Sequence, residues 1–274
     1  MNLNYQEQLY IELIEDKLNI KINKIKRINK GTLSKVFLLN NKYILKLADE
    51  MLIKRETIFF KKNHFPLLEK LVFCDDKNRF LVFKFISGEN LSIITKENVE
   101  EYIKQIVEIA KNYKKTYRKK YGYIYENYDT WYDFLKSEID FNKSFLPEEF
   151  NKKEENYVKR ALENIKNIKI DSRYIHGDLG LHNIIFKNNK IKGIIDPTTV
   201  VGDYRYDIVY FVLSSYTISQ HTNFEVLIKD LGEDVKYLLL ILLYSRIEKT
   251  YKYNSTQEEI DFYKKIWQDL KMGV

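Results

Sequence analysis

Apolar and polar residues alternate along three short runs in the first fifty positions of the chain. Alternation with a period of two is typical of strands that bury one face. The segment KGTL and the dipeptide Asn40–Asn41 separate the runs, and the dipeptide favours a tight turn. The pattern therefore predicts strands joined in antiparallel fashion, over residues 22–29, 34–40 and 42–48.

A helical period replaces this alternation at residues 49–63, where Met51, Ile58 and Phe59 are among the apolar positions. Two further apolar runs predict strands at 70–74 and 79–86. Beyond the polar stretch SGENL the pattern becomes mainly helical, and a short strand-rich block interrupts it at 173–197. The helices predicted there cover 98–120, 129–142, 147–168, 205–218, 224–230, 234–253 and 256–271.

This order of elements predicts an α+β fold with two lobes. Residues 1–86 would form a small antiparallel sheet with one helix, and residues 87–274 a mostly helical lobe with a small β insert. The linker would lie at about residues 86–90. Ligands often bind between domains, so the junction of the lobes is the first place to expect a site.

The net charge of +7 is divided unevenly along the chain. Residues 1–120 hold 25 Lys and Arg against 15 Asp and Glu, whereas residues 121–274 hold 21 against 24. A basic first part suits a polyanion, and a mildly acidic second part suits a cation. With 274 residues, 45% of them hydrophobic, the chain can also bury a large core.

Composition disfavours several classes of protein. A single cysteine, Cys74, rules out an internal disulfide framework and fits a reducing compartment. The N-terminal stretch is acidic and amphipathic, unlike a signal peptide, and the longest apolar run, 237–244, is far below the ~20 residues of a membrane span. The basic and aromatic run 111–128 fits the solvated end of an amphipathic helix. We therefore expect a cytoplasmic protein without a membrane or nucleic-acid partner.

The stretch HGDLGLHNIIF, residues 176–186, carries the clearest chemistry. Asp178 and Asn183 lie five positions apart on a loop between two apolar strands, and Asp196 ends the next apolar run. Carboxylate and amide oxygens are the hard ligands that Mg²⁺ prefers. Asn183 and Asp196 suit metal binding, which leaves Asp178 to accept a proton from an attacking hydroxyl, as in phosphoryl transfer by kinases.

Features upstream of this stretch fit the same chemistry. Lys46 lies in the third apolar run, and Glu56 follows ten positions later on the predicted helix, where it could orient the lysine. The loop 31–36 lies between the first two strands, where a loop that covers the phosphates belongs. The order of these residues along the chain is the order of the corresponding residues in kinases.

On these motifs the chain resembles the aminoglycoside phosphotransferase family, within a group that includes choline, fructosamine and methylthioribose kinases. The family's HGDxxxxN loop corresponds to residues 176–183, and its IDxxxxxxGDxxxD stretch lies within residues 194–208. Residues 80–91 resemble the family's hinge, and residues 129–135 resemble a common helix start. The resemblance extends from about residue 20 to residue 220 and implies a bilobal protein-kinase-like fold.

The resemblance also implies roles for individual residues. Asp178 would act as the base or orient the hydroxyl, and Asn183 and Asp196 would hold Mg²⁺. Lys46, oriented by Glu56, would contact the phosphates of ATP, with GTP left open. The other implied contacts to the nucleotide are amides near Gly31, the Ser34 hydroxyl and the main chain from Lys84 to Ile86. Asp203 and Asp207 would be structural, tying down the catalytic loop and the helix that follows.

Other conspicuous residues predict packing or exclude a class. His176 and His182 are expected to be structural, because no cysteine or third histidine completes a transition-metal site with them. Trp131 and Trp267 are expected to pack in the core. Gly202 follows Asp196 by only six positions, which leaves no room for the long activation loop of a regulated protein kinase.

These observations predict an ATP-dependent kinase acting on a hydroxyl of a small molecule, with an aminoglycoside as the first choice of acceptor. The alternatives are a metabolite kinase for choline, a fructosamine or a sugar, and a catalytically silent nucleotide-binding protein. The oligomeric state is left open. A cationic acceptor would be met beyond residue 205 by acidic side chains, for which the candidates are Glu225, Asp230, Glu233, Asp234, Glu248, Glu258, Glu259 and Asp261.

Overall fold

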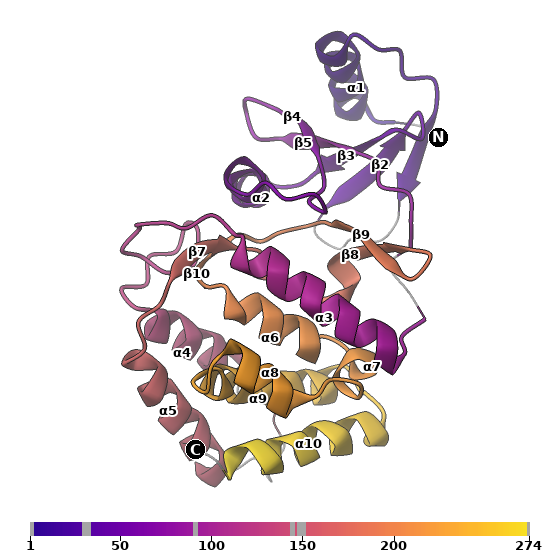
Figure 1. The fold of residues 1–274 in the computed structure, drawn as a ribbon. Helices are drawn as coiled ribbons and strands as arrows, with labels where there is room; N and C mark the ends of the chain where they lie inside the picture. Colours follow the sequence, from indigo (N-terminus) through magenta and orange to yellow (C-terminus); the bar gives the residue numbers. More distant parts are fainter. Residues whose placement is uncertain (1–2, 29–33, 90–92, 143–145, 147–151, 273–274) are drawn as a thin grey trace.

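A computed structural model describes residues 3–28, 34–89, 93–142, 146 and 152–272. Figure 1 shows two lobes, a sheet with two helices and a larger, mostly helical body. The sheet is antiparallel with the strand order β1-β2-β3-β5-β4, which confirms the predicted α+β bilobal fold. Its strands are β1 (Ile25–Ile28), β2 (Lys35–Leu39), β3 (Tyr43–Leu47), β4 (Leu71–Cys74) and β5 (Phe80–Lys84).

The turn predicted between the second and third strands is present. Asn40 and Asn41 have φ values of 51° and 55°, and the amide of Lys42 donates to the Leu39 carbonyl at 2.9 Å. Two successive residues with positive φ match the twist of a tight hairpin, and asparagine adopts this conformation more readily than most residues. The turn fixes the register in which Lys46 pairs with Val36 and Leu81.

Two helices cover the two faces of this sheet. Helix α1 (Tyr5–Leu18) packs Ile14 against the face that includes Phe80, while helix α2 (Glu50–Lys62) packs against the face that includes Leu81. Neighbouring residues of one strand point to opposite faces, so each helix has its own small core. The sequence predicted only one helix in this lobe, because the amphipathic pattern of the N-terminal stretch was not assigned to an element.

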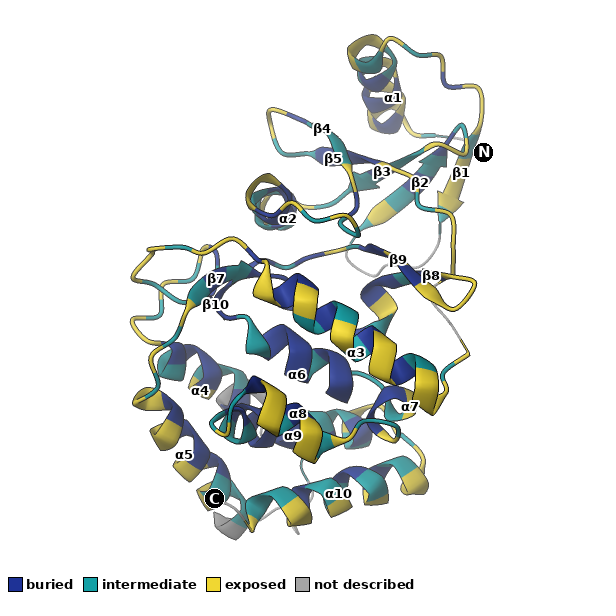
Figure 2. Ribbon diagram, in the orientation of Figure 1, coloured by how far each residue is buried: buried dark blue, intermediate teal, exposed yellow. Residues whose placement is uncertain are grey.

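The larger lobe is built from helices around two small sheets. Figure 2 shows α6 buried along most of its length and α3 exposing one side to solvent. Among the described residues, no helix has the length and apolar character needed to cross a membrane. The helices are α3 (Lys96–Lys111), α4 (Trp131–Asn142), α5 (Lys152–Lys166), α6 (Arg205–Leu213), α7 (Tyr216–Ser219), α8 (Phe224–Leu231), α9 (Val235–Lys252) and α10 (Gln257–Lys271). The strands are β6 (Gly122–Tyr123), β7 (Ser172–Ile175), β8 (Ile184–Lys187), β9 (Lys190–Ile194) and β10 (Val200–Asp203).

The helix predicted over 98–120 is wrong in its second half, since α3 ends at Lys111. The buried side chain of Asn63 accepts a hydrogen bond from the Lys114 amide and donates to the Tyr174 carbonyl. The amide of Tyr174 in turn donates to the Lys114 carbonyl. These partners replace helical hydrogen bonds after Lys111, so the basic and aromatic run beyond this residue is mostly irregular and contains the short strand β6 rather than the end of a helix.

Two more boundaries differ from the prediction. The helix expected over 205–218 is divided into α6 and α7 at Ser214, whose hydroxyl accepts a hydrogen bond from the Leu181 amide. Helix α5 begins at Lys152, and residues 147–151 of its predicted range lie outside the described part of the chain. Trp131 and Trp267 are buried at 3% and 0% exposure, which confirms that they pack in the core.

Candidate active site

Lys46 and Glu56 form a buried ion pair between β3 and α2. Lys46 Nζ lies 2.6 Å from Glu56 Oε2 and 2.8 Å from Oδ1 of Asp196, which belongs to the helical lobe. Burial alone would lower the pKa of Lys46, but the two carboxylates outweigh it and raise the pKa, so the ammonium stays charged. The structure therefore brings together three residues predicted to share one site.

The other predicted contacts to the nucleotide are placed less completely. Gly31 lies outside the described residues, and half-buried Ser34 directly precedes β2. The amide of Lys84 donates to the Lys70 carbonyl at 2.9 Å, so it is already occupied. Among the described residues, the amide of Ile86 donates to no backbone oxygen. Within the predicted hinge, Ile86 is therefore the better candidate to donate to a nucleobase.

Asp207 fixes the loop that carries Asp178. The backbone amides of His176 and Gly177 donate to the Asp207 carboxylate at 2.7 and 2.9 Å. The ring of His176 is fully buried, and its Nε2 lies 2.9 Å from the Ile195 carbonyl oxygen. Burial lowers the pKa of His176 to about 4, so the ring is neutral. These contacts confirm the structural roles expected of His176 and Asp207.

Two glycines let this loop fold tightly. Gly177 has a φ of 82°, and a Cβ atom there would lie 2.5 Å from the hydroxyl of Thr198. At Gly180 a Cβ atom would lie 2.6 Å from the ring of His182. Side chains at these positions would strain the backbone or push away the neighbours of Asp178, which explains why a chain with nine glycines has two here.

The carboxylate of Asp178 is hydrogen-bonded at both oxygens. The hydroxyl of Tyr210 donates to Oδ1 at 2.6 Å, while Oδ2 accepts from Asn183 Nδ2 at 3.1 Å and lies 3.3 Å from His182 Nε2. Burial alone would raise the pKa of Asp178, but the hydrogen bonds from His182 and Tyr210 outweigh it and hold the pKa below its usual range. Asp178 is therefore ionised at neutral pH and oriented to accept a proton.

Asn183 and Asp196 lie close together, because the amide of Ile195 donates to the Asn183 carbonyl at 3.0 Å. The side-chain nitrogen of Asn183 donates hydrogen bonds to Asp178, which leaves the side-chain oxygen as the atom that could bind a metal. Among the described residues, no three acidic, His or Cys side chains cluster as metal ligands. A pair of oxygen ligands of this kind fits Mg²⁺ that is also held by phosphate oxygens and water.

A pocket of about 430 Å³ opens beside Asp178 in the helical lobe. Tyrosine rings form much of its wall, including Tyr123, Tyr206, Tyr210 and Tyr253. Its charged lining, besides Asp178, consists of Glu138 from α4 and of Arg246 and Lys249 from α9. Because Asp178 lies in the lining, a hydroxyl compound bound here would be placed next to its carboxylate.

None of the eight acidic residues proposed for this surface lines the pocket, although all eight are described. Asp234 pairs with Arg205, Glu259 pairs with Arg246, and Glu248 is buried. Helix α9 instead presents residues 242, 245, 246 and 249 to the pocket, which is the spacing of one helical face. The acidic candidates beyond residue 205 therefore do not line the pocket at Asp178, and their contact with an acceptor stays a prediction.

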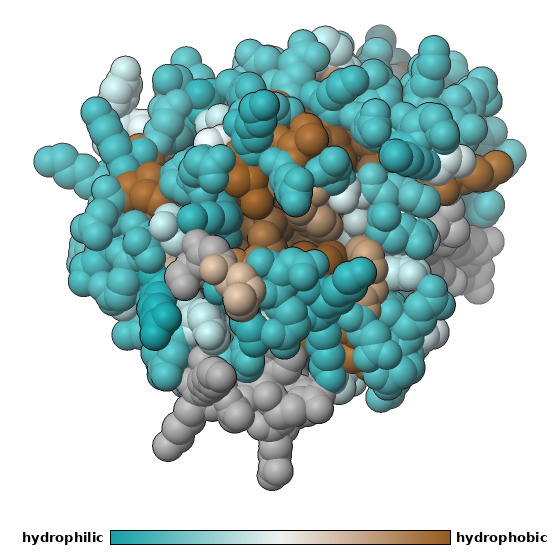
Figure 3. Space-filling model, turned by 60° about the horizontal axis from the view of Figure 1, so that its bottom comes forward, coloured by the Kyte–Doolittle hydropathy of each residue, from teal (hydrophilic) through white to brown (hydrophobic). Residues whose placement is uncertain are grey.

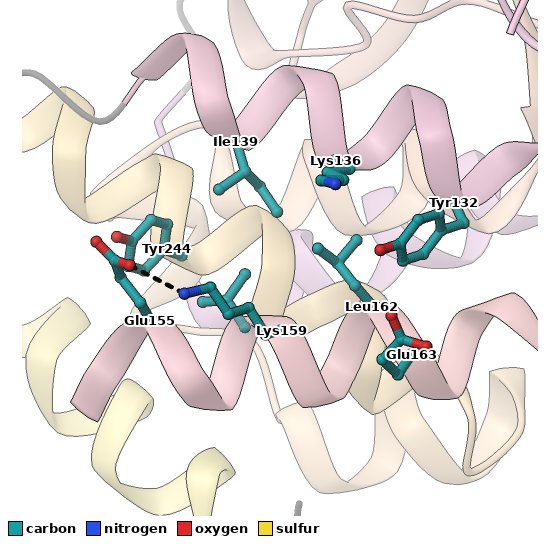
Figure 4. Close-up of a pocket in the computed structure, with 9 residues that line it drawn as sticks. Tyr132, Lys136, Ile139, Glu155, Lys159, Leu162, Glu163 and Tyr244 are labelled. Carbon is teal, nitrogen blue, oxygen red and sulfur yellow. Dashed lines mark hydrogen bonds and ion pairs between the residues drawn. The ribbon is translucent and has the colours of Figure 1, made fainter. Parts of the chain in front are cut away.

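A second hollow lies between α4, α5 and α9, with a volume of about 270 Å³. Figure 4 shows Ile139 and Leu162 within it, and Lys159 paired with Glu155 near its edge. Its lining shares no residue with the pocket at Asp178. The face in Figure 3 is mostly hydrophilic, with apolar side chains gathered in a central hollow.

Residues 24–233 match the phosphotransferase enzyme family. The chain belongs to this family. No curated protein matches it in sequence.

Among solved structures, the phosphotransferase is similar to a mutant of the aminoglycoside phosphotransferase APH(4)-Ia in a ternary complex with AMP-PNP and hygromycin B. The identity is 12%, the TM-score is 0.63, and the alignment covers 96% of this chain and 97% of that one. It is also similar to APH(2″)-IIIa in its GDP and kanamycin complex, at 14% identity and a TM-score of 0.57, over 97% and 99% of the two chains. At this level of identity the likeness shows a common fold.

Sequence reasoning missed several residues of the phosphotransferase site. Tyr210 and Lys249 are far from the catalytic motif in sequence, and nothing in their local patterns indicates a site. Glu69 is buried near the Lys46 pair, where burial raises the pKa of its carboxyl well above the ordinary value. A glutamate within the apolar run FPLLEKLVF was the signal that could have identified it. His182, expected to be structural, contacts Asp178 and lines the pocket.

Proposed function

We propose that this phosphotransferase transfers the γ-phosphate of ATP to a hydroxyl of a small molecule. The observation that carries the proposal is an ionised Asp178 in the lining of a pocket of about 430 Å³. The Lys46–Asp196 pair is linked to this loop, since Ile195 donates to Asn183 and Asn183 donates to Asp178. Phosphate binding and proton acceptance thus belong to one connected site.

The reaction would proceed by direct transfer. The acceptor oxygen forms a bond to the γ-phosphorus while the bond from this phosphorus to the bridging oxygen breaks, and ADP leaves with that oxygen. The hydroxyl proton passes to the carboxylate of Asp178, which Tyr210 and Asn183 hold in place. The Lys46 ammonium, oriented by Glu56, would bind the phosphates and offset their charge.

Asn183 and Asp196 would hold Mg²⁺. The metal, when bound, offsets negative charge on the transferred phosphoryl group. In this structure Asp196 forms an ion pair with Lys46. When nucleotide binds, its phosphates would replace Asp196 as the partner of the Lys46 ammonium, and the Asp196 carboxylate would bind the metal. A backbone donor at Ile86 could serve either purine, and the similar structures hold both adenine and guanine nucleotides.

Two classes of acceptor have support. The similar structures hold kanamycin and hygromycin B, which favours an aminoglycoside. A metabolite with a hydroxyl group is the other class, and the mixed charges of the pocket favour it. A silent nucleotide-binding protein is disfavoured, because Lys46, Glu56, Asp178, Asn183 and Asp196 are all retained.

The test is release of ADP from ATP and Mg²⁺ by the purified protein, with and without acceptors. The panel contains aminoglycosides, choline, sugars, fructosamines and hydroxy acids. We expect one class to stimulate release, and we expect Asp178→Asn to reduce the stimulated rate about 100-fold or more while ATP still binds. Stimulation that persists in Asp178→Asn would contradict the role of Asp178. Failure of the wild-type protein to bind ATP with Mg²⁺ would contradict the kinase proposal itself.

A further inference from the structure

The pocket beside Asp178 contains fixed positive charge. Its lining holds two carboxylates, Asp178 and Glu138, and two cations, Arg246 and Lys249, together with His182. A polycation binds where carboxylates outnumber cations, and this lining has no such excess.

Lys249 lines the pocket close to the tyrosine that bonds Asp178. Its Nζ lies 5.4 Å from the centre of the Tyr210 ring, and the hydroxyl of that ring donates to Asp178. The side chain is only partly exposed. Among the described side chains, no carboxylate forms an ion pair with Lys249. The ammonium therefore lies beside the ring that bonds Asp178, and among the described side chains it has no ion-paired carboxylate.

Burial lowers the pKa of Lys249, and the attraction of Asp178 does not fully restore it. The charged form of a half-buried ammonium is therefore short of stabilising partners. A cationic ligand in the pocket would destabilise the charged form of Lys249 further. A carboxylate or phosphate would stabilise it and accept a charge-assisted hydrogen bond.

The other charged groups of the pocket do not prevent Lys249 from binding an anion. Arg246 is held by Glu259 at 2.7 Å and lies over the ring of Tyr263, so its position is fixed. Glu138 accepts a long hydrogen bond from Tyr123, at 3.5 Å, and burial raises the pKa of its carboxyl. Neither group neutralises Lys249 by direct contact.

We infer that the acceptor carries an anionic group, a carboxylate or a phosphate, which Lys249 binds while the acceptor hydroxyl reaches Asp178. This inference rests on the proposed kinase function and specifies its acceptor. Arg246 adds to the positive potential on the same face of α9. The lining thus favours hydroxy acids and phosphorylated hydroxyl compounds over the polycationic aminoglycosides.

The first experiment compares acceptors that differ in charge and little else. Glycerate and glycerol phosphate are the anionic probes, glycerol is neutral, choline and kanamycin are cationic, and glucose 6-phosphate is paired with glucose. ADP release is measured with each, and binding of each to the complex with Mg²⁺ and AMP-PNP is measured by calorimetry. We expect turnover or binding only with anionic probes, and the carboxylate and phosphate arms show which anion fits.

Variants then test whether Lys249 is the binding group. Lys249→Met should raise the KM or Kd of the anionic probe about 10- to 100-fold with a smaller effect on kcat, and Lys249→Arg should restore much of it. Glu138→Gln removes a negative charge from the same pocket and should lower KM. Lys159→Met removes a lysine that lines the other hollow and should change neither constant.

The outcomes separate the two proposals. Turnover of kanamycin, choline or a neutral compound in preference to anionic probes, or an unchanged KM in Lys249→Met, would overturn the inference and leave the kinase function intact. Binding of Mg²⁺ and AMP-PNP without binding of any anionic probe at about 10 mM would also overturn it. Loss of nucleotide binding in the wild-type protein would overturn both.

Discussion

At the scale of single residues, the state of Asp178 is set by its neighbours more than by its burial. Tyr210, Asn183 and His182 all approach its two oxygens, and their hydrogen bonds favour the ionised form. The same contacts hold the carboxylate in one orientation. A carboxylate that is both ionised and fixed is what acceptance of a hydroxyl proton requires.

Tyr210→Phe is expected to alter the pH dependence of the reaction. The Tyr210 hydroxyl stabilises the carboxylate, so its loss raises the pKa of Asp178. Activity needs the ionised form, and the acidic limb of the profile of kcat/KM should therefore move to higher pH. The profile is measured with the best acceptor, and kcat/KM at neutral pH should fall about tenfold. Tyr216→Phe, which removes a hydroxyl bonded to exposed Glu258, is the control and should leave the limb in place.

Lys46→Met is expected to abolish ATP binding and to destabilise the fold. The substitution leaves Glu56 buried at 2% exposure without its cation, which costs about 3 kcal/mol. The double variant Lys46→Met with Glu56→Gln removes both charges and should recover most of the stability but none of the ATP binding. Urea unfolding and calorimetry measure the two effects. Equal stability of the single and double variants would contradict this account.

At the scale of elements, the end of α3 depends on a residue that directly follows another helix. Asn63 follows α2 and joins the chain at Lys114 to the β7 strand at Tyr174. A window of sequence around residue 111 does not contain these partners. The helical period continues past Lys111 in the sequence, and the tertiary hydrogen bonds override it.

Asn63→Ala is expected to lower the free energy of unfolding by about 2 kcal/mol, because it removes the buried side chain that bonds both the Lys114 amide and the Tyr174 carbonyl. Chemical denaturation measures the change. Asn164→Ala removes an exposed asparagine that bonds within its own helix and is the matched control, with an expected change below about 0.5 kcal/mol. Similar losses in the two variants would show that Asn63 does not join these segments.

The sequence predicted correctly those elements whose determinants lie close together along the chain. The Asn40–Asn41 turn and the helix containing Glu56 have their determinants within a few residues, whereas the loop from His176 to Asn183 carries a local motif but is held by Asp207 from α6. The pairing of Lys46 with Glu56 also followed, because it needs only a strand and the next helix. The catalytic roles of these residues stay predictions, since geometry alone does not measure activity.

The residues that line the pocket beside Asp178 could not be predicted from the sequence, for a physical reason. Its charged residues come from α4 and α9, which meet only when the helical lobe is packed. Lys249 and Glu248 are neighbours in sequence, yet one lines the pocket and the other is buried away from it. The count of acidic residues beyond residue 120 could not tell these positions apart, which is why it pointed to a cationic acceptor.

At the scale of the whole molecule, contacts at the site join the two lobes, and others lie away from it, such as the hydrogen bonds of Asn63 to Lys114 and Tyr174. Asp196 of the helical lobe pairs with Lys46 of the sheet lobe. A Cβ atom on Gly193 of β9 would lie 2.3 Å from the side chain of Ile86, so the absence of a side chain there lets the hinge approach closely. Ligands that bind between the lobes should therefore stabilise both together.

Mg²⁺ with AMP-PNP is expected to raise the thermal unfolding midpoint of the wild-type protein. At a ligand concentration of 100 times Kd the gain is about 2.7 kcal/mol. In Asp196→Asn the nucleotide should still raise the midpoint, but the extra rise on adding Mg²⁺ should be lost. Scanning fluorimetry with and without EDTA measures this. An undiminished magnesium effect in Asp196→Asn would remove that residue from the metal site.

Helix α9 joins the pocket beside Asp178, the proposed acceptor site, to the hydrophobic core. Leu239, Leu243 and Ile247 are buried, while Ser245 and Lys249 line the pocket from the same helix. Few positions of α9 can therefore be substituted to change the acceptor without disturbing the core. Random substitution along α9 would mostly produce unfolded protein. The tolerated changes that alter acceptor choice would recur with a period of three to four residues. Variants selected for a new substrate would therefore carry their substitutions on one face of this helix.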